Sequence, residues 1–212
     1  MSSVNLTAAQ TPGTRMRADE RRALVLEAAT QVIGERGYHG ATTDAVARAA
    51  GVSQPYVVRM FGSKEALFLA VLERALDRLM ATFVEAVDEG QEAASAGDSE
   101  AMTHCIAQNY VGLLADRGLL LSLMQAFMLG ADPVIGPAAR AGMRRVYEFL
   151  REHAGMGPME AHDFLAKGMM LNTLVGLRMS ADYETEPSVR ELLDEALPTK
   201  LDFLLSLRDA ES

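Results

Sequence analysis

The sequence predicts an all-α protein, and three observations support that prediction. Apolar residues recur at the three- and four-residue spacing of a helix from Arg15 onward. Ala, Leu, Met and Glu, which are residues that favour helices, dominate the composition. The chain contains no run of alternating β-branched residues and neither an Asn-Gly nor an Asp-Gly hairpin turn. We expect a three-helix domain at the N-terminus and a larger helical domain after it, with about nine helices in total.

Three N-terminal helices are expected, because each is bounded by residues that start or stop helices. Residues 1–14 precede them and carry no charged side chain and no periodic pattern, so they are expected to form a mobile arm. Gly37 is placed to end the first helix, and Thr42 and Ser53 are placed to cap the second and third. Pro55 lies in the first turn of the third helix, where a missing N–H costs little. The expected ranges are Arg17–Arg36, Thr43–Ala50 and Ser53–Phe61.

The rest of the chain is expected to contain longer helices. The first of them follows the cap Ser63 and ends at Gly90, and the polar residues 91–98 are expected to form a loop. Pro198 lies inside the last helical span and predicts either a kink or two separate helices. The remaining expected ranges are Ser99–Asp116, Leu119–Leu129, Pro137–His153, Pro158–Met179 and Ser188–Leu207. The predicted domain boundaries are 1–14 for the arm, 15–63 for the first domain and 64–212 for the second.

Composition limits the class of protein. Of the 212 residues, 49% are hydrophobic and 23% are charged, which is enough apolar surface for a core. A single cysteine, Cys105, excludes an internal disulfide and a Cys-rich zinc site. The first ten residues lack the basic start and apolar run of a signal peptide, and the most apolar stretch, residues 118–131, is too short to span a bilayer. We therefore expect a cytoplasmic protein without a membrane segment.

Residues 42–64, TTDAVARAAGVSQPYVVRMFGSK, have the pattern of a helix-turn-helix module. Two helices of about eight residues flank a turn that contains Gly51. The inward faces are expected to consist of apolar residues, namely Val46, Ala49 and Ala50 on the first helix and Val52, Val57, Val58 and Phe61 on the second. The polar and long side chains left outward are Gln54, Tyr56, Arg59 and Met60, with Lys64 just beyond. These side chains can reach base edges and phosphates.

Residues 20–70 resemble the DNA-binding domain of the TetR family of transcriptional regulators. The resemblance rests on Gly37-Tyr38, Thr42-Thr43, Ala47, Ala50-Gly51-Val52-Ser53, Phe61 and Ser63-Lys64-Glu65-Ala66-Leu67. It implies that the helix after Ser53 lies in the major groove and that residues around it contact bases or phosphates. The DNA-binding residues expected from the resemblance are Thr43, Ser53, Gln54, Pro55, Tyr56, Arg59 and Lys64. The family usually has a tyrosine where this sequence has Val58, and the nearest aromatic residue here is Tyr56.

The net charge of −9 and the pI near 5.0 argue against nucleic-acid binding only when they are averaged over the whole chain. Residues 14–64 carry eight basic and five acidic side chains, a net charge of +3. Residues 65–212 carry twelve basic and twenty-four acidic side chains, a net charge of −12. The part expected to contact phosphate is therefore positive. The arginines from Arg15 to Arg22 are expected either to lie near the DNA backbone or to be an ordinary charged helix start.

The resemblance also implies a homodimer, formed by the last two long helices as a four-helix bundle. The dimer contacts expected on these helices are Leu165, Val175, Leu193, Leu197, Leu201 and Leu204. The alternative is that both are core helices of a monomer. The resemblance further implies an effector pocket, and flexible or hydrogen-bonding side chains are its candidates: Met102, Asn109, Tyr110, Met124, Gln125, Phe127, Met143, Tyr147, Met169 and Asn172. The alternative for each methionine is that it fills the core.

An enzyme is not expected. His104 and Cys105 are adjacent on a helix, so their side chains diverge and cannot form a nucleophile–base pair. Neither a GxSxG, a phosphate-binding Gly loop nor an HExxH motif occurs, and no cofactor or metal is expected. The predicted function is a TetR-like repressor that binds a palindromic double-stranded operator as a dimer and is released by a small, largely apolar ligand. The alternative is a ligand-independent regulator, or a helical interaction protein whose C-terminal domain binds a protein partner.

Overall fold

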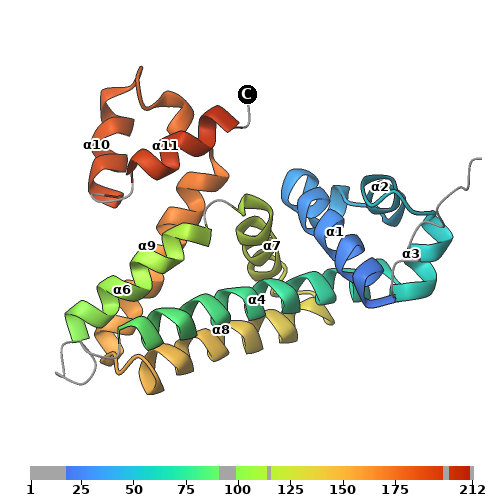
Figure 1. Cartoon of the computed structure of the whole chain (residues 1–212), viewed down its shortest axis with the longest axis horizontal. Helices are drawn as coiled ribbons and strands as arrows, with labels where there is room; N and C mark the ends of the chain where they lie inside the picture. Colours follow the sequence, from blue (N-terminus) through green and yellow to red (C-terminus); the bar gives the residue numbers. More distant parts are fainter. Residues whose placement is uncertain (1–17, 91–98, 114–115, 198–200, 211–212) are drawn as a thin grey trace, which may run out of the picture.

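The computed structural model describes residues 18–90, 99–113, 116–197 and 201–210, and these residues form ten α-helices and one short 3-10 helix, without a strand (Figure 1). The prediction of an all-α fold is confirmed. The elements are α1 (Ala18–Gly40), α2 (Thr43–Ala49), α3 (Gln54–Phe61), α4 (Lys64–Glu89), α6 (Ser99–Gly112), α7 (Arg117–Met128), α8 (Ile135–Glu152), α9 (Pro158–Gly176), η2 (Met179–Asp182), α10 (Pro187–Ala196) and α11 (Leu201–Ala210). The predicted arm, residues 1–14, and the predicted loop, residues 91–98, lie outside the described residues.

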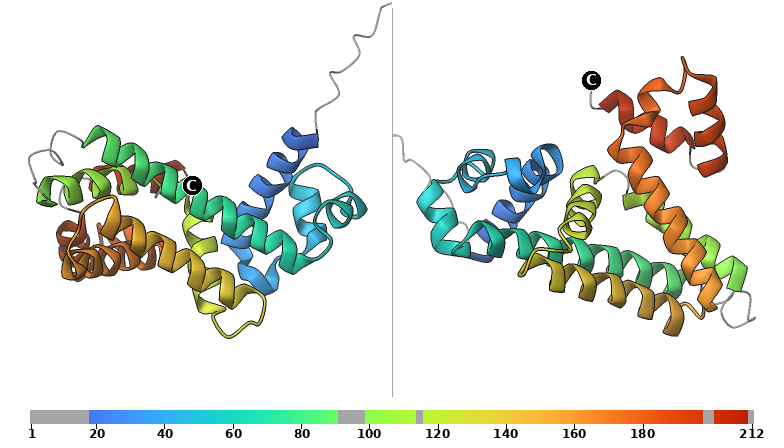
Figure 2. Two further views of the ribbon diagram at one scale, coloured as in Figure 1. Left: turned by 90° about the horizontal axis from the view of Figure 1, so that it is seen from below. Right: turned by 180° about the vertical axis from the view of Figure 1, so that it is seen from behind.

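The helices are arranged around the long α4. Helices α1, α2 and α3 gather at one end of the molecule, and α4 runs from there with α8 alongside it (Figures 1 and 2). Helix α6 packs on the far half of α4, whereas α7 packs against α1. Helix α9 leads away from this layer to η2, α10 and α11. The three N-terminal helices therefore form a distinct end of the molecule, and α7 connects it to the rest.

Local sequence explains where most helices begin and end. Gly37 has a left-handed φ of 68°, and this glycine kinks α1 where the sequence predicted its end. The side-chain oxygen of Thr42 accepts a hydrogen bond from the backbone N–H of Ala45 at 3.1 Å, and that of Ser63 accepts one from Ala66 at 3.1 Å. Both predicted caps are confirmed.

The predicted side-chain cap at Ser53 is wrong. Ser53 occupies the N-cap position of α3, but its hydroxyl accepts no capping hydrogen bond. A capping side chain bonds the N–H of the second or third helical residue, and the second residue here is Pro55, which has no N–H. The backbone carbonyl of Ser53 instead accepts from Tyr56 at 3.0 Å and Val57 at 3.3 Å.

The last predicted helix is divided into two, which is one of the two outcomes that Pro198 predicted. Helix α10 ends at Ala196 and α11 begins at Leu201, on either side of the proline. A proline inside a helix removes one backbone hydrogen bond and clashes with the preceding turn. This division raises the number of helices in the described residues above the nine that the sequence predicted.

The apolar core is continuous from the N-terminal helices to the rest of the chain. Phe83 of α4 lies at its centre, with ring centroids 6.0 Å from Phe149 and 5.8 Å from Phe164. The N-terminal helices join this core through α1, which packs closely along α7. No single helix among the described residues is both long enough and apolar enough to cross a membrane. The segments Ala101–Gly112 and Arg117–Met128, which are bent relative to each other, reach that length and apolar composition only when they are taken together.

Candidate nucleic-acid interface

Helices α2 and α3 form a helix-turn-helix at the exposed end of the molecule (Figure 1). Gly51 has a left-handed φ of 66° in the turn, a conformation that costs glycine little. The backbone N–H of Val52 donates to the carbonyl of Ala47 at 3.0 Å and closes the turn. Val46 and Ala47 from α2 and Val57 from α3 are buried at the contact. The short helices are therefore held at a fixed angle by apolar packing.

Two residues predicted on the inward faces lie outward instead. Ala49 is exposed, and Val58 has 37% of its surface exposed. The reason is the helical repeat: Val57 is fully buried, so Val58, about 100° further around α3, turns away from the core. The exposed face of α3 thus includes Pro55, Val58 and Arg59. Val58 occupies the outer surface at the position where the TetR family usually has a tyrosine.

Polar contacts organise the start of α3. The side-chain amide of Gln54 donates to the hydroxyl of Thr43 at 3.2 Å, which ties the first turn of α3 to the first turn of α2. The guanidinium of Arg59 lies 5.1 Å from the ring centroid of Tyr56, within cation–π range. Gln54 and Tyr56 are half-buried, whereas Ser53 and Arg59 are exposed. Six of the seven predicted DNA-binding residues therefore cluster at the N-terminal turns of α2 and along α3.

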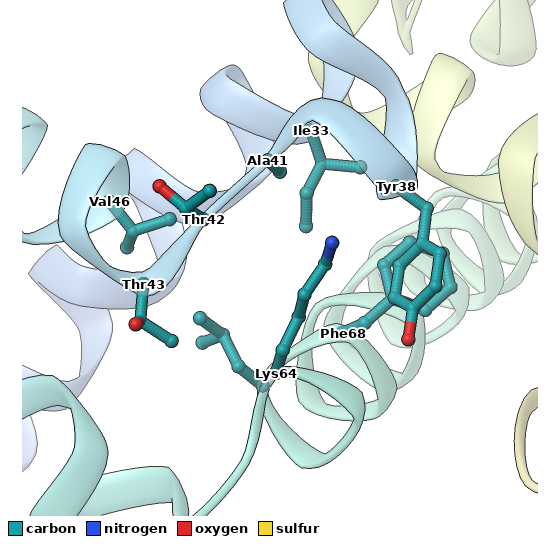
Figure 3. A pocket seen from close by; sticks show the side chains of 9 residues that line it. Ile33, Tyr38, Ala41, Thr42, Thr43, Val46, Lys64 and Phe68 are labelled. Carbon is teal, nitrogen blue, oxygen red and sulfur yellow. The ribbon is translucent and has the colours of Figure 1, made fainter.

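Lys64, the seventh predicted residue, begins α4 and points back toward α1. Its ammonium group donates to the carbonyl of His39 at 3.1 Å and lies 4.6 Å from the ring centroid of Tyr38. Figure 3 shows this group beside the Tyr38 ring, directed from the start of α4 toward the end of α1. Thr43 and Lys64 line the same small pocket of about 10 Å³, which holds at most about one water. Lys64 thus links α4 to the last turn of α1.

Tyr38 connects this end of the molecule to α7, a role that the sequence pattern did not reveal. Its ring is buried and packs 4.8 Å from Phe68, while its hydroxyl donates to Glu65 at 3.5 Å. Burial, followed by the charges of Glu65 and Asp132, raises the pKa of Tyr38 above its ordinary value. The backbone N–H of Tyr38 also donates to the side chain of Gln125 at 3.5 Å. The only signal in the sequence was the Gly37-Tyr38 pair within the family resemblance.

The structure describes some, but not all, of the arginines that precede or begin the first helix. The guanidinium of Arg22 lies 4.6 Å from the ring centroid of Phe61, so it covers the end of α3. Arg15 and Arg17 lie outside the described residues. Arg22 is thereby on the same end of the molecule as α3, and its contact with DNA stays a prediction.

The predicted effector residues lie in different surroundings. None of the ten lines either of the two pockets that we describe, the small one beside Lys64 or the larger one beside Arg117. Gln125 contacts Tyr38 of α1, and Tyr147 is 37% exposed on α8. Met102 is buried against Gly90, as core filler would be. The half-buried members of the set are Asn109, Met124, Gln125, Phe127, Met143 and Met169.

Tyr110 and Asn172 are brought together across 62 residues of sequence. The hydroxyl of Tyr110 donates to the side-chain oxygen of Asn172 at 2.6 Å in a buried setting. Burial raises the pKa of Tyr110 to about 12, and the hydrogen bond to Asn172 opposes that shift. The pair satisfies two polar groups that the core would otherwise leave unbonded. Both residues were predicted to orient a ligand, and in this structure they bond to each other.

Four of the six predicted dimer residues are buried within the chain itself. Val175, Leu193, Leu197 and Leu204 each expose less than a tenth of their surface, so a second subunit has almost nothing left to cover. The reason is that α9, η2, α10 and α11 fold against one another. Leu165 and Leu201 are half-buried. The apolar side chains that do protrude from α9 are on its other face and include Met159, Met170 and Leu177.

The described residues bring together no group of three or more His, Cys, Asp or Glu side chains that could hold a metal ion. His104 contacts Gln108, and His162 contacts Asp163, so these two histidines have separate partners. Cys105 is half-buried, and its thiol lies 3.2 Å from the carbonyl of Ala86.

Comparison with known proteins identifies the N-terminal module. Residues 25–71 match the family described as "Bacterial regulatory proteins, tetR family". The chain is 48% identical over 68 residues to the HTH-type transcriptional activator FasR of Mycolicibacterium smegmatis, covering 32% of this chain and 31% of that protein. It is 39% identical over 71 residues to the HTH-type transcriptional regulator RutR of Escherichia coli, covering 33% of this chain and 34% of that protein. The matches thus span about a third of the length of these curated relatives.

The whole fold also has solved counterparts. A TetR-like transcriptional regulator from Rhodococcus sp. RHA1 aligns over 91% of this chain and 96% of its own, with 25% sequence identity and a TM-score of 0.59. The curated relatives are named as transcriptional regulators rather than enzymes, in agreement with the prediction from sequence. The matching module lies at the N-terminus and the matching fold extends over most of the chain. Residues 25–71 therefore match the tetR family of bacterial regulatory proteins, and the chain as a whole is similar in fold to a TetR-like regulator.

Proposed function

We propose that the protein is a DNA-binding transcriptional regulator that inserts α3 into the major groove. The observation that carries this proposal is the helix-turn-helix itself, with Val57 buried and Arg59 exposed on the opposite side of α3. A helix of this length fits the major groove and presents its first turns to base edges. The net charge of +3 over residues 14–64 favours an approach with this end toward the phosphates.

The side chains divide into two roles in this proposal. Gln54, Tyr56 and Arg59 lie on or beside the exposed face of α3 and would contact base edges or the phosphates next to them. Thr43, Ser53, Pro55 and Lys64 flank that face and would hold the DNA backbone. Lys64 lies at the N-terminus of α4, where free backbone N–H groups also favour a phosphate.

We further propose that the protein binds a palindromic operator as a homodimer. Two half-sites about one helical turn of DNA apart, roughly 34 Å, need two copies of α3 related by a two-fold axis. The surface that we assign to the dimer is the exposed apolar face of α9, which includes Met159, Met170 and Leu177 with exposed fractions of 70%, 48% and 67%. Burying such side chains between subunits removes apolar surface from water.

We also propose that the protein represses transcription and that a ligand releases it from the operator. A ligand changes DNA affinity only when it binds one arrangement of the helices better than the other. Contacts that would transmit such a change already join the two ends: Gln125 of α7 to Tyr38, and Tyr38 to Lys64. The half-buried Met124, Met143 and Met169 have flexible side chains that could repack around a largely apolar ligand.

Selection of binding sites from random duplex DNA tests the proposal. We expect a palindromic consensus whose two halves are each bound by one α3. Binding should weaken steeply as the salt concentration rises, because phosphate contacts release counterions. Recovery of no consensus, or binding that ignores salt, would refute the proposed function. Repeating the selection with Arg59→Ala distinguishes base reading from backbone contact, because only base reading changes the consensus.

A further inference from the structure

A cleft of about 310 Å³ opens where the N-terminal helices meet the rest of the chain. Gln31 and Glu35 of α1 line one side, and Arg117 and Leu121 of α7 line the other, with Arg178 contributed from beyond α9. Three segments far apart in sequence therefore share one recess. Its volume lies at the lower end of the range of about 300–1,000 Å³ that small-molecule sites occupy.

Arg117 is held in place within this cleft. Its Nε donates to the carbonyl of Val175 at 3.4 Å, and one terminal nitrogen donates to the carbonyl of Gly176 at 3.2 Å. These carbonyls belong to the last turn of α9, and the carbonyl of Val175 also accepts from the backbone N–H of Arg178 at 3.1 Å. A guanidinium has five N–H groups, so three remain for another acceptor. The side chain is thereby ordered in advance of any ligand, which lowers the entropic cost of binding.

Arg178 brings a second guanidinium to the same cleft. Its backbone adopts a left-handed conformation with φ of 55°, which is uncommon for residues other than glycine. This turn directs the chain from α9 into η2 and places Arg178 among the lining residues. Two guanidiniums and the single carboxylate of Glu35 leave the cleft with a net positive charge. Guanidiniums bind carboxylates through paired hydrogen bonds.

We propose that this cleft binds a small hydroxy or amino acid. The carboxylate of the ligand pairs with Arg117 and Arg178. The carboxylate of Glu35 and the side-chain amide of Gln31, which line the same cleft from α1, bond its hydroxyl or amino group. Leu121 contacts the carbon skeleton. Because the cleft offers both guanidiniums and a carboxylate, it selects an acid that also carries a hydrogen-bond donor.

The cleft adjoins a close contact between the two ends of the molecule. Gly34 of α1 and Gly118 of α7 also line it, and a Cβ atom added to Gly34 would lie 2.7 Å from the Cα of Gly118. A ligand that bridges α1 and α7 at this point therefore acts on the angle between these helices. An effect on operator affinity rests on the proposed DNA-binding function, whereas the binding of the acid does not.

Isothermal titration of the full chain with L-malate, L-glutamate and inorganic phosphate tests the site without DNA. We expect at least one of the two organic acids to bind one per chain, and phosphate to bind about tenfold more weakly or not at all. Arg117→Gln should weaken the affinity for the acid by about tenfold or more. Arg144→Gln, on the exposed side of α8, should leave that affinity unchanged. Gln31→Trp, at an exposed position of α1, should block the cleft while the circular dichroism spectrum stays helical.

Three results would overturn the proposal. They are the absence of binding by both acids at up to about 10 mM, equal or tighter binding of phosphate, and full binding by the folded Gln31→Trp variant. Because no DNA is present, a failure here leaves the proposed regulator function standing. A chain that binds the acid and selects no operator would refute the regulator function alone.

Discussion

Gly34 of α1 and Gly118 of α7 meet backbone to backbone, and a Cβ atom on Gly34 would lie 2.7 Å from the Cα of Gly118. A Cβ on Gly118 would in turn lie 3.1 Å from the carbonyl oxygen of Thr30. Neither neighbour is the end of a flexible side chain, so the helices themselves must separate to admit a methyl group. This contact sets the distance between α1, at the helix-turn-helix end of the molecule, and α7.

Gly34→Ala is therefore expected to lower the free energy of unfolding by about 1–3 kcal/mol, as overpacking does in a tight core. Urea denaturation followed by circular dichroism measures the change. Gly112→Ala is the matched control, because a Cβ there would meet nothing within 4 Å. The control should be neutral or more stable by up to about 1 kcal/mol, since alanine favours helices. Equal stability of the Gly34→Ala variant and the parent would show that α1 and α7 can separate freely.

Arg59→Ala is expected to weaken binding to the selected operator by about 1–3 kcal/mol, if Arg59 reads a base. Arg59 is exposed on α3 and is held by its cation–π contact with Tyr56. Fluorescence anisotropy with operator and with scrambled DNA distinguishes sequence-specific from non-specific binding. Arg144→Ala, on α8, should change neither. An equal loss on both DNAs would assign Arg59 to the phosphate backbone.

Lys64→Ala is expected to weaken operator and scrambled DNA alike, because a phosphate contact carries no sequence information. The slope of log affinity against log salt should fall by about 0.9 per protomer, the contribution of one phosphate in B-DNA. Lys64→Arg should keep the slope, because it keeps the charge. A slope unchanged in Lys64→Ala would mean that the ammonium group stays with the carbonyl of His39 when DNA is bound.

Tyr110→Phe is expected to lower the free energy of unfolding by about 1–3 kcal/mol, because it leaves the buried side chain of Asn172 without its partner. The raised pKa of Tyr110, about 12 against an ordinary 10.0, adds a pH dependence. Between these values the folded chain retains a proton that the unfolded chain loses, so stability falls as the pH rises above about 10. Denaturation at pH 8 and near pH 11 should show a larger alkaline loss in the parent than in the variant. An identical alkaline loss of stability in the parent and in the variant would assign the titration to a group other than Tyr110.

Met170→Glu is expected to convert the proposed dimer to a monomer, since it puts a charge on the exposed apolar face of α9. Size-exclusion chromatography with light scattering gives the mass directly. Met128→Glu is the control, because Met128 is 81% exposed on α7, away from α9's outer face. A dimer that survives Met170→Glu would move the subunit contact to another surface.

Local sequence determined the helix-turn-helix and most helix boundaries. Thr42, Ser63, Gly37 and Gly51 act through hydrogen bonds and backbone conformations within a few residues of themselves, so a linear reading suffices for them. Ser53 makes no side-chain cap for an equally local reason: Pro55 has no N–H, and Tyr56 donates its N–H to the backbone carbonyl of Ser53. Pro198 predicted either a kink or two separate helices at the end of the chain, and two helices form.

Only the tertiary structure decided which face each helix buries and which distant residues meet. Val57 and Val58 are chemically alike, yet Val57 is fully buried and Val58 is 37% exposed, because α2 and α4 pack against one side of α3. Leu193 and Leu197 are buried within the chain, where η2 contacts α9, α10 and α11, and no periodicity distinguishes such burial from a subunit contact. The pairing of Tyr110 with Asn172 and the crossing of Gly34 with Gly118 join residues more than sixty positions apart. Sequence spacing shows which residues share one face of a helix, whereas the burial of that face and its partner depend on how the whole chain closes around its core.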